Sequence, residues 1–160
     1  MTASSCAEGY SVEGLLDLNN SEQKPALEWK ANGNQNEWAQ LNWDCTQEIH
    51  EIVLMPDAAD VAKIKKASLV FSNGTRIDVS SYLPMNTPVA IPVEPQLATW
   101  VRLEIEEAEG DAAGLGDFQV YGSMHATYEE LKNLYMEGQD ILSKQNEYAE
   151  EGWNLSLIHI

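Results

Sequence analysis

The sequence predicts a mainly β protein, an antiparallel β-sandwich followed by a C-terminal α-helical segment. Residues 1–122 contain several short runs that alternate apolar and polar residues, separated by Gly, Pro and Asn. From residue 127 onward, apolar residues instead recur at helical spacing. A chain of 160 residues holds one domain of ordinary size and a small appendage.

Three segments carry the clearest strand patterns. TWVRLEIEE (99–107) places Val, Leu and Ile on one face and charged residues on the other. GDFQVYG (116–122) alternates in the same way, and EIHEIVLM (48–55) is rich in β-branched residues. The prolines at 84, 88, 92 and 95 argue against long helices in the connections.

A hairpin is predicted within ASLVFSNGTRIDV (67–79), because two strand-like runs surround Asn73-Gly74. This dipeptide favours a type I′ turn, in which both central residues have positive φ. We therefore expect Asn73 and Gly74 to occupy such a turn.

The helical segment begins with a capping pattern, Thr127 followed three residues later by Glu130. Residues 127–146 then predict one amphipathic helix with an acidic outer face. A single helix is marginal alone, so it requires either the sandwich or further helices as a partner. The final residues, LSLIHI (155–160), match the translation of a transposon end sequence used in preparing sequencing libraries, and we expect a non-native tail.

The charge of the chain restricts its partners. It has 26 acidic and 9 basic residues, a formal charge of −17. Such a surface repels nucleic acid and anionic membranes, and it suits neutral ligands, cations or simple solubility. No segment has the ~18 apolar residues needed to cross a bilayer, so membrane insertion is not expected. The first residues lack a signal-peptide pattern.

Neither the cysteines nor the acidic pairs indicate catalysis. Cys6 and Cys45 could form one bridge or remain two thiols. Acidic pairs such as Glu106-Glu107 are neighbours on polar faces, with no sign of the apolar pocket that raises a carboxyl pKa. The nucleophile-elbow, zinc-helix and phosphate-loop motifs are missing from the sequence. We therefore predict that the chain is not an enzyme.

The order of these segments resembles the galactose-binding-like β-sandwich, a jelly-roll fold. That family includes discoidin domains, coagulation-factor type C domains and bacterial carbohydrate-binding modules. The resemblance covers roughly residues 3–122 and rests on DLNN (17–20), LEW (27–29), NEWAQLNW (36–43), EIHEIVL (48–54), ASLVFSNGTRI (67–77), TWVRLEI (99–105) and AGLGDFQVYG (113–122).

The resemblance implies a non-catalytic carbohydrate-binding module with a glycan as its partner. It implies an extracellular or cell-surface location and a larger exported bacterial protein, in which the module targets a glycan-active enzyme to its substrate. Two alternatives stay open: a structural or adhesive domain that contacts proteins, and a lipid-surface module of the discoidin kind. The negative charge opposes the last of these.

The resemblance also implies a structural calcium, with Asp17, Asn19 and Asp117 as the matching ligands. Calcium takes six to eight oxygen ligands, so backbone carbonyls would complete the set. Leu27 stands where the family has Thr, which removes a hydroxyl ligand, and Asp117 is shorter than the expected Glu. The alternative is a metal-free loop held by turn hydrogen bonds of Asp17 and Asn19.

In this fold a sugar usually binds in the loops at one end of the sandwich. The candidate ligand-binding residues are Tyr10, Asn32, Asn34 and Tyr82, an aromatic and amide set suited to stacking and paired hydrogen bonds. His50 is interpreted as a solvent-facing strand residue, since it alternates within a strand.

NEWAQLNW (36–43) contains two tryptophans, and alternation places Trp38 and Trp43 on opposite strand faces. The resemblance packs both tryptophans into the protein body, so neither is predicted as a sugar platform.

Residues 128–154 resemble the start of a FIVAR repeat, a small helical module of secreted or wall-attached bacterial proteins, here truncated within its second helix. A helix that folds back on the sandwich is the alternative. The predicted organisation is a sandwich over 1–122, a partial FIVAR-like segment over 123–154 and a non-native tail over 155–160.

Overall fold

The computed structural model describes residues 1–16, 28–56, 63–84, 87–125 and 128–150, with helix side chains described over 131–144. The chain divides into two compact units, Met1–His125 and Ala126–Ile160. The proposed tail (155–160) and Thr127 lie outside the described residues.

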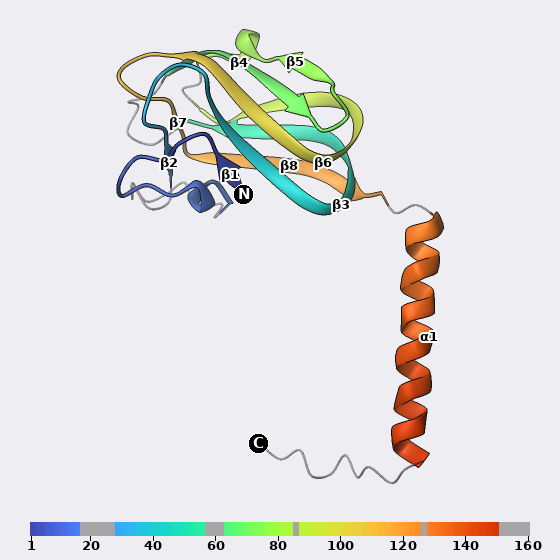
Figure 1. The fold of residues 1–160 in the computed structure, drawn as a ribbon. Coiled ribbons are helices and arrows are strands. Elements are labelled where there is room, and N and C mark those ends of the chain that lie inside the picture. Colours follow the sequence, from blue (N-terminus) through green and yellow to red (C-terminus); the bar gives the residue numbers. More distant parts are fainter. Residues whose placement is uncertain (17–27, 57–62, 85–86, 126–127, 151–160) are drawn as a thin grey trace. The chain divides into compact units, whose positions relative to one another are not determined.

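The first unit is an antiparallel β-sandwich, which confirms the predicted fold class (Figure 1). Within the described residues, two short 3-10 helices accompany the strands, η1 (Val12–Leu16) and η3 (Ser80–Tyr82). The strands are β1 (Thr2–Ala3), β2 (Trp29–Lys30), β3 (Glu37–Met55), β4 (Ile64–Phe71), β5 (Arg76–Asp78), β6 (Val89–Ala108), β7 (Gly114–Leu115) and β8 (Asp117–Met124).

Two long strands, β3 and β6, take part in both layers of the sandwich (Figure 1). The first half of β3 pairs with the second half of β6, in a layer of order β1-β3-β6-β4-β5. The second half of β3 pairs with the first half of β6 and with β8. The register shifts between Asn42 and Gln47, and such irregularities bend a strand. Each long strand can therefore cross from one layer to the other.

The prolines of β6 are accommodated at a sheet edge. Pro92 and Pro95 lie in its first half, which pairs with β3 on one side while β4 pairs only with the second half. A proline that lacks an N–H is tolerated where no ladder partner needs that donor. The sequence-based placement of these prolines in strand-free connections was therefore wrong.

Apolar side chains from both layers meet in one core. Ile52 of β3, Leu69 of β4, Leu103 of β6 and Phe118 of β8 are all at most 1% exposed. Burying such side chains stabilises the fold by about 1.5–3 kcal/mol each. The alternation predicted for residues 99–107 is present along β6, where Val101, Leu103 and Ile105 are buried. Along β8, for which alternation was predicted over residues 116–122, the consecutive residues Asp117 and Phe118 are both buried.

The predicted hairpin is present, but its turn differs from the expected type. Strands β4 and β5 pair through Leu69 and Ile77, and the Gly74 N–H donates to the Phe71 carbonyl at 2.9 Å. Gly74 has φ +89°, while Asn73 is not among the described residues with positive φ. The turn is therefore not type I′, because that type needs positive φ at both central residues.

The two tryptophans of residues 36–43 have different environments. Trp43 is partly buried and packs against the core, as predicted. Trp38 lies on the outer face of the first layer, partly exposed, with the Arg102 guanidinium 4.2 Å from its ring centroid. The prediction that Trp38 packs into the protein body was wrong, because alternation directs it away from the buried Ala39 and Leu41.

The second unit contains α1 (Tyr128–Glu150), four residues longer at its C-terminal end than the predicted helix of 127–146. Its described apolar side chains are exposed, including Leu131, Leu134, Ile141 and Leu142 at 54–65%. Lys144 Nζ lies 2.6 Å from Asp140 Oδ2, an ion pair between successive turns. Among the described residues, no helix is both long and apolar enough to cross a membrane.

Candidate ligand-binding site

Three of the four predicted ligand-binding residues lie on the loops around β2. The N-terminal segment runs beside this strand, with Ala7 N donating to the Lys30 carbonyl at 2.8 Å and Ser11 N to the Glu28 carbonyl at 3.1 Å. These bonds place Tyr10 next to Lys30, whose Nζ is 5.6 Å from the centre of the Tyr10 ring. The aromatic ring is partly exposed and in cation–π contact.

Asn32 presents an exposed amide on the same loops. Its backbone N–H donates to Ser5 Oγ at 2.9 Å, and that hydroxyl donates to Glu37 Oε2 at 2.8 Å. Within the described part of the chain, neither the Asn32 side-chain amide nor the Tyr10 hydroxyl makes a hydrogen bond. Both groups are therefore available to a ligand.

Asn34 has a clear structural contact. Its side-chain Nδ2 donates to the Gly110 carbonyl at 2.6 Å, and its backbone carbonyl accepts a hydrogen bond from Ala108 N at 2.8 Å. These bonds hold the loop that carries Asn32 against the connection between β6 and β7. A contact between Asn34 and a ligand stays a prediction.

Tyr82 lies on a different loop, at the end of η3, and is 38% exposed. The backbone N–H of Tyr82 donates to the Val79 carbonyl at 3.0 Å, and that of Val79 donates to the Ala67 carbonyl at 3.1 Å. The described hydrogen bonds do not link it to Tyr10 or Asn32. Its role in binding remains a prediction.

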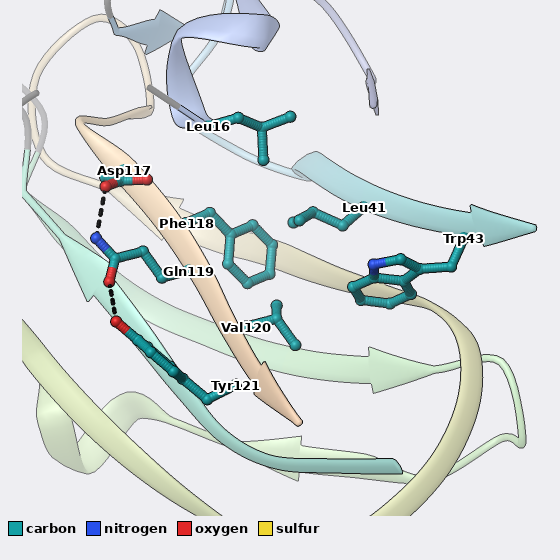
Figure 2. Close-up of a pocket in the computed structure, with 8 residues that line it drawn as sticks. All are labelled: Leu16, Leu41, Trp43, Asp117, Phe118, Gln119, Val120 and Tyr121. Carbon is teal, nitrogen blue, oxygen red and sulfur yellow. Dashed lines mark hydrogen bonds between the residues drawn. The ribbon is translucent and has the colours of Figure 1, made fainter. Parts of the chain in front are cut away.

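A small apolar pocket that the sequence did not reveal lies beside β8 (Figure 2). Phe118 and Val120 point from β8 toward Leu41 and Trp43 of β3, and Leu16 of η1 lies at one end. The pocket has a volume of about 290 Å³. Its lining residues come from three segments that are distant in sequence, η1, β3 and β8, so only the fold brings them together.

A row of three polar side chains of β8 also lines the pocket and lies on the other side of the strand from Phe118 and Val120 (Figure 2). Tyr121 Oη donates to Gln119 Oε1 at 2.7 Å, and Gln119 Nε2 donates to Asp117 Oδ2 at 2.7 Å. Asp117 is fully buried, with 0% of its surface exposed. The row therefore holds one carboxylate oxygen of Asp117 in a fixed direction.

The predicted calcium ligands are only partly within the described chain. Asp17, Asn19 and Leu27 lie outside the described residues, whereas Asp117 is described. Among the residues that the structure does describe, no group of three or more His, Cys, Asp or Glu is placed to hold a metal ion. A buried carboxylate at the start of β8 is compatible with the proposed site, and the calcium remains a prediction.

The sequence profile of the family described as "Domain of unknown function (DUF7402)" matches residues 1–121. The chain belongs to this family. No curated protein sequence matches the chain significantly.

Several solved structures share the fold of the DUF7402 domain. The family 32 carbohydrate-binding module of C. perfringens NanJ, in complex with galactose, has a TM-score of 0.60 at 15% identity and covers 74% of this chain and 90% of its own. A fucose-binding module of Streptococcus pneumoniae has a TM-score of 0.61 at 16% identity, covering 75% and 90%. Chitosan-binding module 2 from a Paenibacillus sp. IK-5 chitosanase/glucanase, in complex with chitotriose, has a TM-score of 0.61 at 20% identity, covering 76% and 94%.

These likenesses confirm the galactose-binding-like sandwich predicted from the order of sequence motifs. At 15–20% identity they concern the fold alone, and binding residues cannot be transferred from them. The FIVAR-like interpretation of α1 stays a prediction.

Proposed function

We propose that the DUF7402 domain of this chain is a non-catalytic carbohydrate-binding module. The observation that carries the proposal is the sandwich itself. Its match covers at least 90% of the length of two solved modules, one in complex with galactose and one in complex with chitotriose. The available ring and amide on the loops around β2 support it. These are the groups with which proteins usually recognise sugars.

In this proposal the loops around β2 bind one sugar unit. The Tyr10 ring packs against the C–H face of the sugar, and the Asn32 amide donates to one hydroxyl and accepts from another. Lys30, beside Tyr10, offers an ammonium donor to the same sugar. The hydrogen bonds of Ser5 and Asn34 fix the loop before the ligand arrives, which lowers the entropy lost on binding.

We further propose that the domain belongs to a larger exported bacterial protein and acts outside the cell or at its surface. Its linked neighbouring domains would include a glycan-active enzyme, which the module holds near its substrate. Weak binding by one module is multiplied when neighbouring modules are linked to it.

Binding to a glycan array, followed by calorimetry on the best ligand, tests the function. We expect selective binding that Tyr10→Ala or Asn32→Ala weakens by about tenfold or more, or at least ~1.4 kcal/mol. Tyr135→Ala is the matched control, because it removes an exposed tyrosine from the other compact unit. A blank array with folded protein would contradict the proposal and favour the adhesive alternative.

We also propose a structural calcium bound by Asp17, Asn19 and Asp117, with backbone carbonyls completing the ligand set. Support comes from the full burial of Asp117 and from Leu16, the residue before Asp17, which lines the same pocket as Asp117. When bound, calcium would neutralise these carboxylates and join two distant segments of the sandwich. Asp117 itself would contribute a carboxylate oxygen that the Gln119 amide helps to orient.

Thermal melting with added calcium tests this site. Because a ligand that binds only the folded state stabilises it, millimolar calcium should raise the melting temperature. Asp117→Asn should abolish that rise, whereas Asp111→Asn, a change at an exposed aspartate, should preserve it. An unchanged melting temperature in the wild-type protein, with no heat of calcium binding, would exclude the site.

A further inference from the structure

The outer face of the first layer gathers two tryptophans and an arginine. Trp38 extends from β3, and Trp100 and Arg102 extend from β6. The Arg102 guanidinium lies 4.2 Å from the Trp38 ring centroid and 5.4 Å from that of Trp100. Both indoles are partly exposed, so together with Gln40 and Asn42 they form a surface that we name the indole face.

Strand pairing fixes the length of the indole face. Trp38 pairs with Glu104, Gln40 with Arg102 and Asn42 with Trp100. The backbone positions of the two tryptophans are therefore offset by four residues along the strands, or about 13 Å at 3.3–3.4 Å per residue. The rings themselves lie closer together, because the centroids of both are within 5.4 Å of Arg102 Cζ. A ligand that contacts both rings must therefore reach across the Arg102 guanidinium.

Hydrogen-bonding groups lie between the two rings. Arg102 Nε donates to Gln40 Oε1 at 2.8 Å, and Gln40 Nε2 donates to Asn42 Oδ1 at 2.6 Å. Arg102 Nη1 is 3.6 Å from Glu104 Oε1, an ion pair beyond hydrogen-bond distance. Neither Nη group donates a hydrogen bond to any described residue, and the side chain is 29% exposed. Their N–H donors can therefore reach a ligand.

Beside the indole face, the outer side of the first layer carries balanced charges on a strongly acidic protein. Lys66 Nζ lies 2.5 Å from Glu106 Oε2, and Arg76 Nη1 lies 2.6 Å from Glu104 Oε2. Arg102 and Asp78 complete a set of three cations and three anions on the outer side of the first layer. Both arginines of the chain belong to it, although the chain carries a formal charge of −17. A neutral ligand suits this face, because it brings no charge that the surface must compensate.

We propose that the indole face is a second binding surface, which takes a neutral oligosaccharide lying along β3 and β6. The two indoles stack on sugar rings, while Arg102 Nη groups and the Asn42 amide bond hydroxyls between them. The proposal shares the glycan class with the proposed function but places this contact on the sheet, away from the loops around β2. It assigns to Trp38 and Trp100 a role beyond stabilising the sheet.

Calorimetry with neutral β-1,4-linked glucan and chitin oligosaccharides, from one to six units, tests the surface. We expect affinity to rise with oligomer length, so that the preferred oligomer binds about tenfold or more tightly than its monosaccharide. Trp100→Ala and Arg102→Gln should each remove most of that gain and leave monosaccharide affinity unchanged. Tyr10→Ala, in the loops around β2, should weaken the monosaccharide and leave binding of the oligosaccharide at the indole face unchanged. Indole fluorescence of the wild-type protein should change on binding, and less so in Trp100→Phe.

Each other result contradicts one proposal in particular. If Trp100→Ala and Arg102→Gln lower thermal stability but leave oligosaccharide affinity unchanged, the indole face is structural and only the further inference fails. If no neutral oligosaccharide of any length binds, and Trp100→Ala instead abolishes binding of a protein partner, the indole face is a protein-contacting surface. If affinity depends on Tyr10 alone at every length, the loop site stands and the sheet site falls.

Discussion

Single glycines show how closely the strands approach one another. A Cβ added at Gly122 of β8 would collide with the backbone carbonyl group of Glu48 in β3. It would lie 3.0 Å from the Glu48 carbonyl carbon and closer still to the carbonyl oxygen. Glu48 belongs to the backbone ladder and cannot give way as a flexible side chain would. Gly138 of α1, by contrast, has no heavy atom within 4 Å of such a Cβ.

We therefore expect Gly122→Ala to destabilise the sandwich by about 2 kcal/mol or more, because it forces β8 away from β3. The free energy of unfolding by urea measures this change. Gly138→Ala is the matched control, and it should leave sandwich unfolding unchanged while raising helicity, since Ala favours a helix by about 1 kcal/mol over Gly. Equal stability of the Gly122 variant and the wild type would show that the strands are not in such close contact.

The charged pairs of the outer face also act at the residue scale. The hydrogen bond from Lys66, with its charge, lowers the pKa of the Glu106 carboxyl below its ordinary value of 4.5. A group whose pKa is lowered in the folded state stabilises the fold at pH values above its unfolded pKa. This contribution is lost as the pH falls through the folded-state pKa. Since Lys66 is exposed and Glu106 is partly exposed, the effect is small and screened by salt.

Glu106→Gln tests the sign of this contribution. The variant should melt slightly below the wild type at neutral pH and low salt, and the difference should vanish as pH falls below the ordinary glutamate value of 4.5. Differential scanning calorimetry from neutral to acidic pH measures it. A difference that grows on acidification would contradict the assignment.

At the scale of elements, the alternation of apolar and polar residues predicted which segments form β structure better than it predicted where each strand begins and ends. Residues 36–43 and 48–55 were expected as separate strands, yet they form one strand of 19 residues, β3. Their joining depends on bends that let the chain cross between layers, and no residue pattern specifies those bends. The helix was easier to predict, because apolar spacing over several turns is a local property.

The division of the chain into two compact units predicts the result of a truncation. The described buried core lies entirely within Met1–His125, so removing residues 126–160 leaves that core complete. We expect the melting temperature of Met1–His125 to stay within about 2 °C of that of the full chain. A fall of many degrees would show that the helix packs on the sandwich.

At the scale of the whole molecule, the net charge predicts which partners the protein repels. A formal charge of −17 places the sequence isoelectric point near 4.3. Counterion release, which drives most binding to nucleic acid, needs basic side chains, and this chain has 9 against 26 acidic ones. The balanced charges beside the indole face are a local exception to this charge.

We expect no measurable binding to duplex DNA or to phosphatidylserine vesicles at about 0.1 M salt, where charges within roughly 10 Å still interact. Electrophoretic mobility shift and vesicle sedimentation measure the two cases. Neutral phosphatidylcholine vesicles are the control for contact through exposed apolar residues. Binding that is selective for phosphatidylserine would restore the lipid-surface alternative.

The sequence by itself determined the class of fold, the presence of the hairpin and helix, and the acidic surface. Each depends on local periodicity or on composition, which survive in any conformation of the chain. The tertiary structure alone decided that Trp38 meets Arg102 and that Trp43 shares a pocket with Phe118. It also showed that Asn34 holds the Gly110 carbonyl. These contacts join residues far apart in sequence, and they depend on strand register and bending, which the chain acquires only when its two layers pack together.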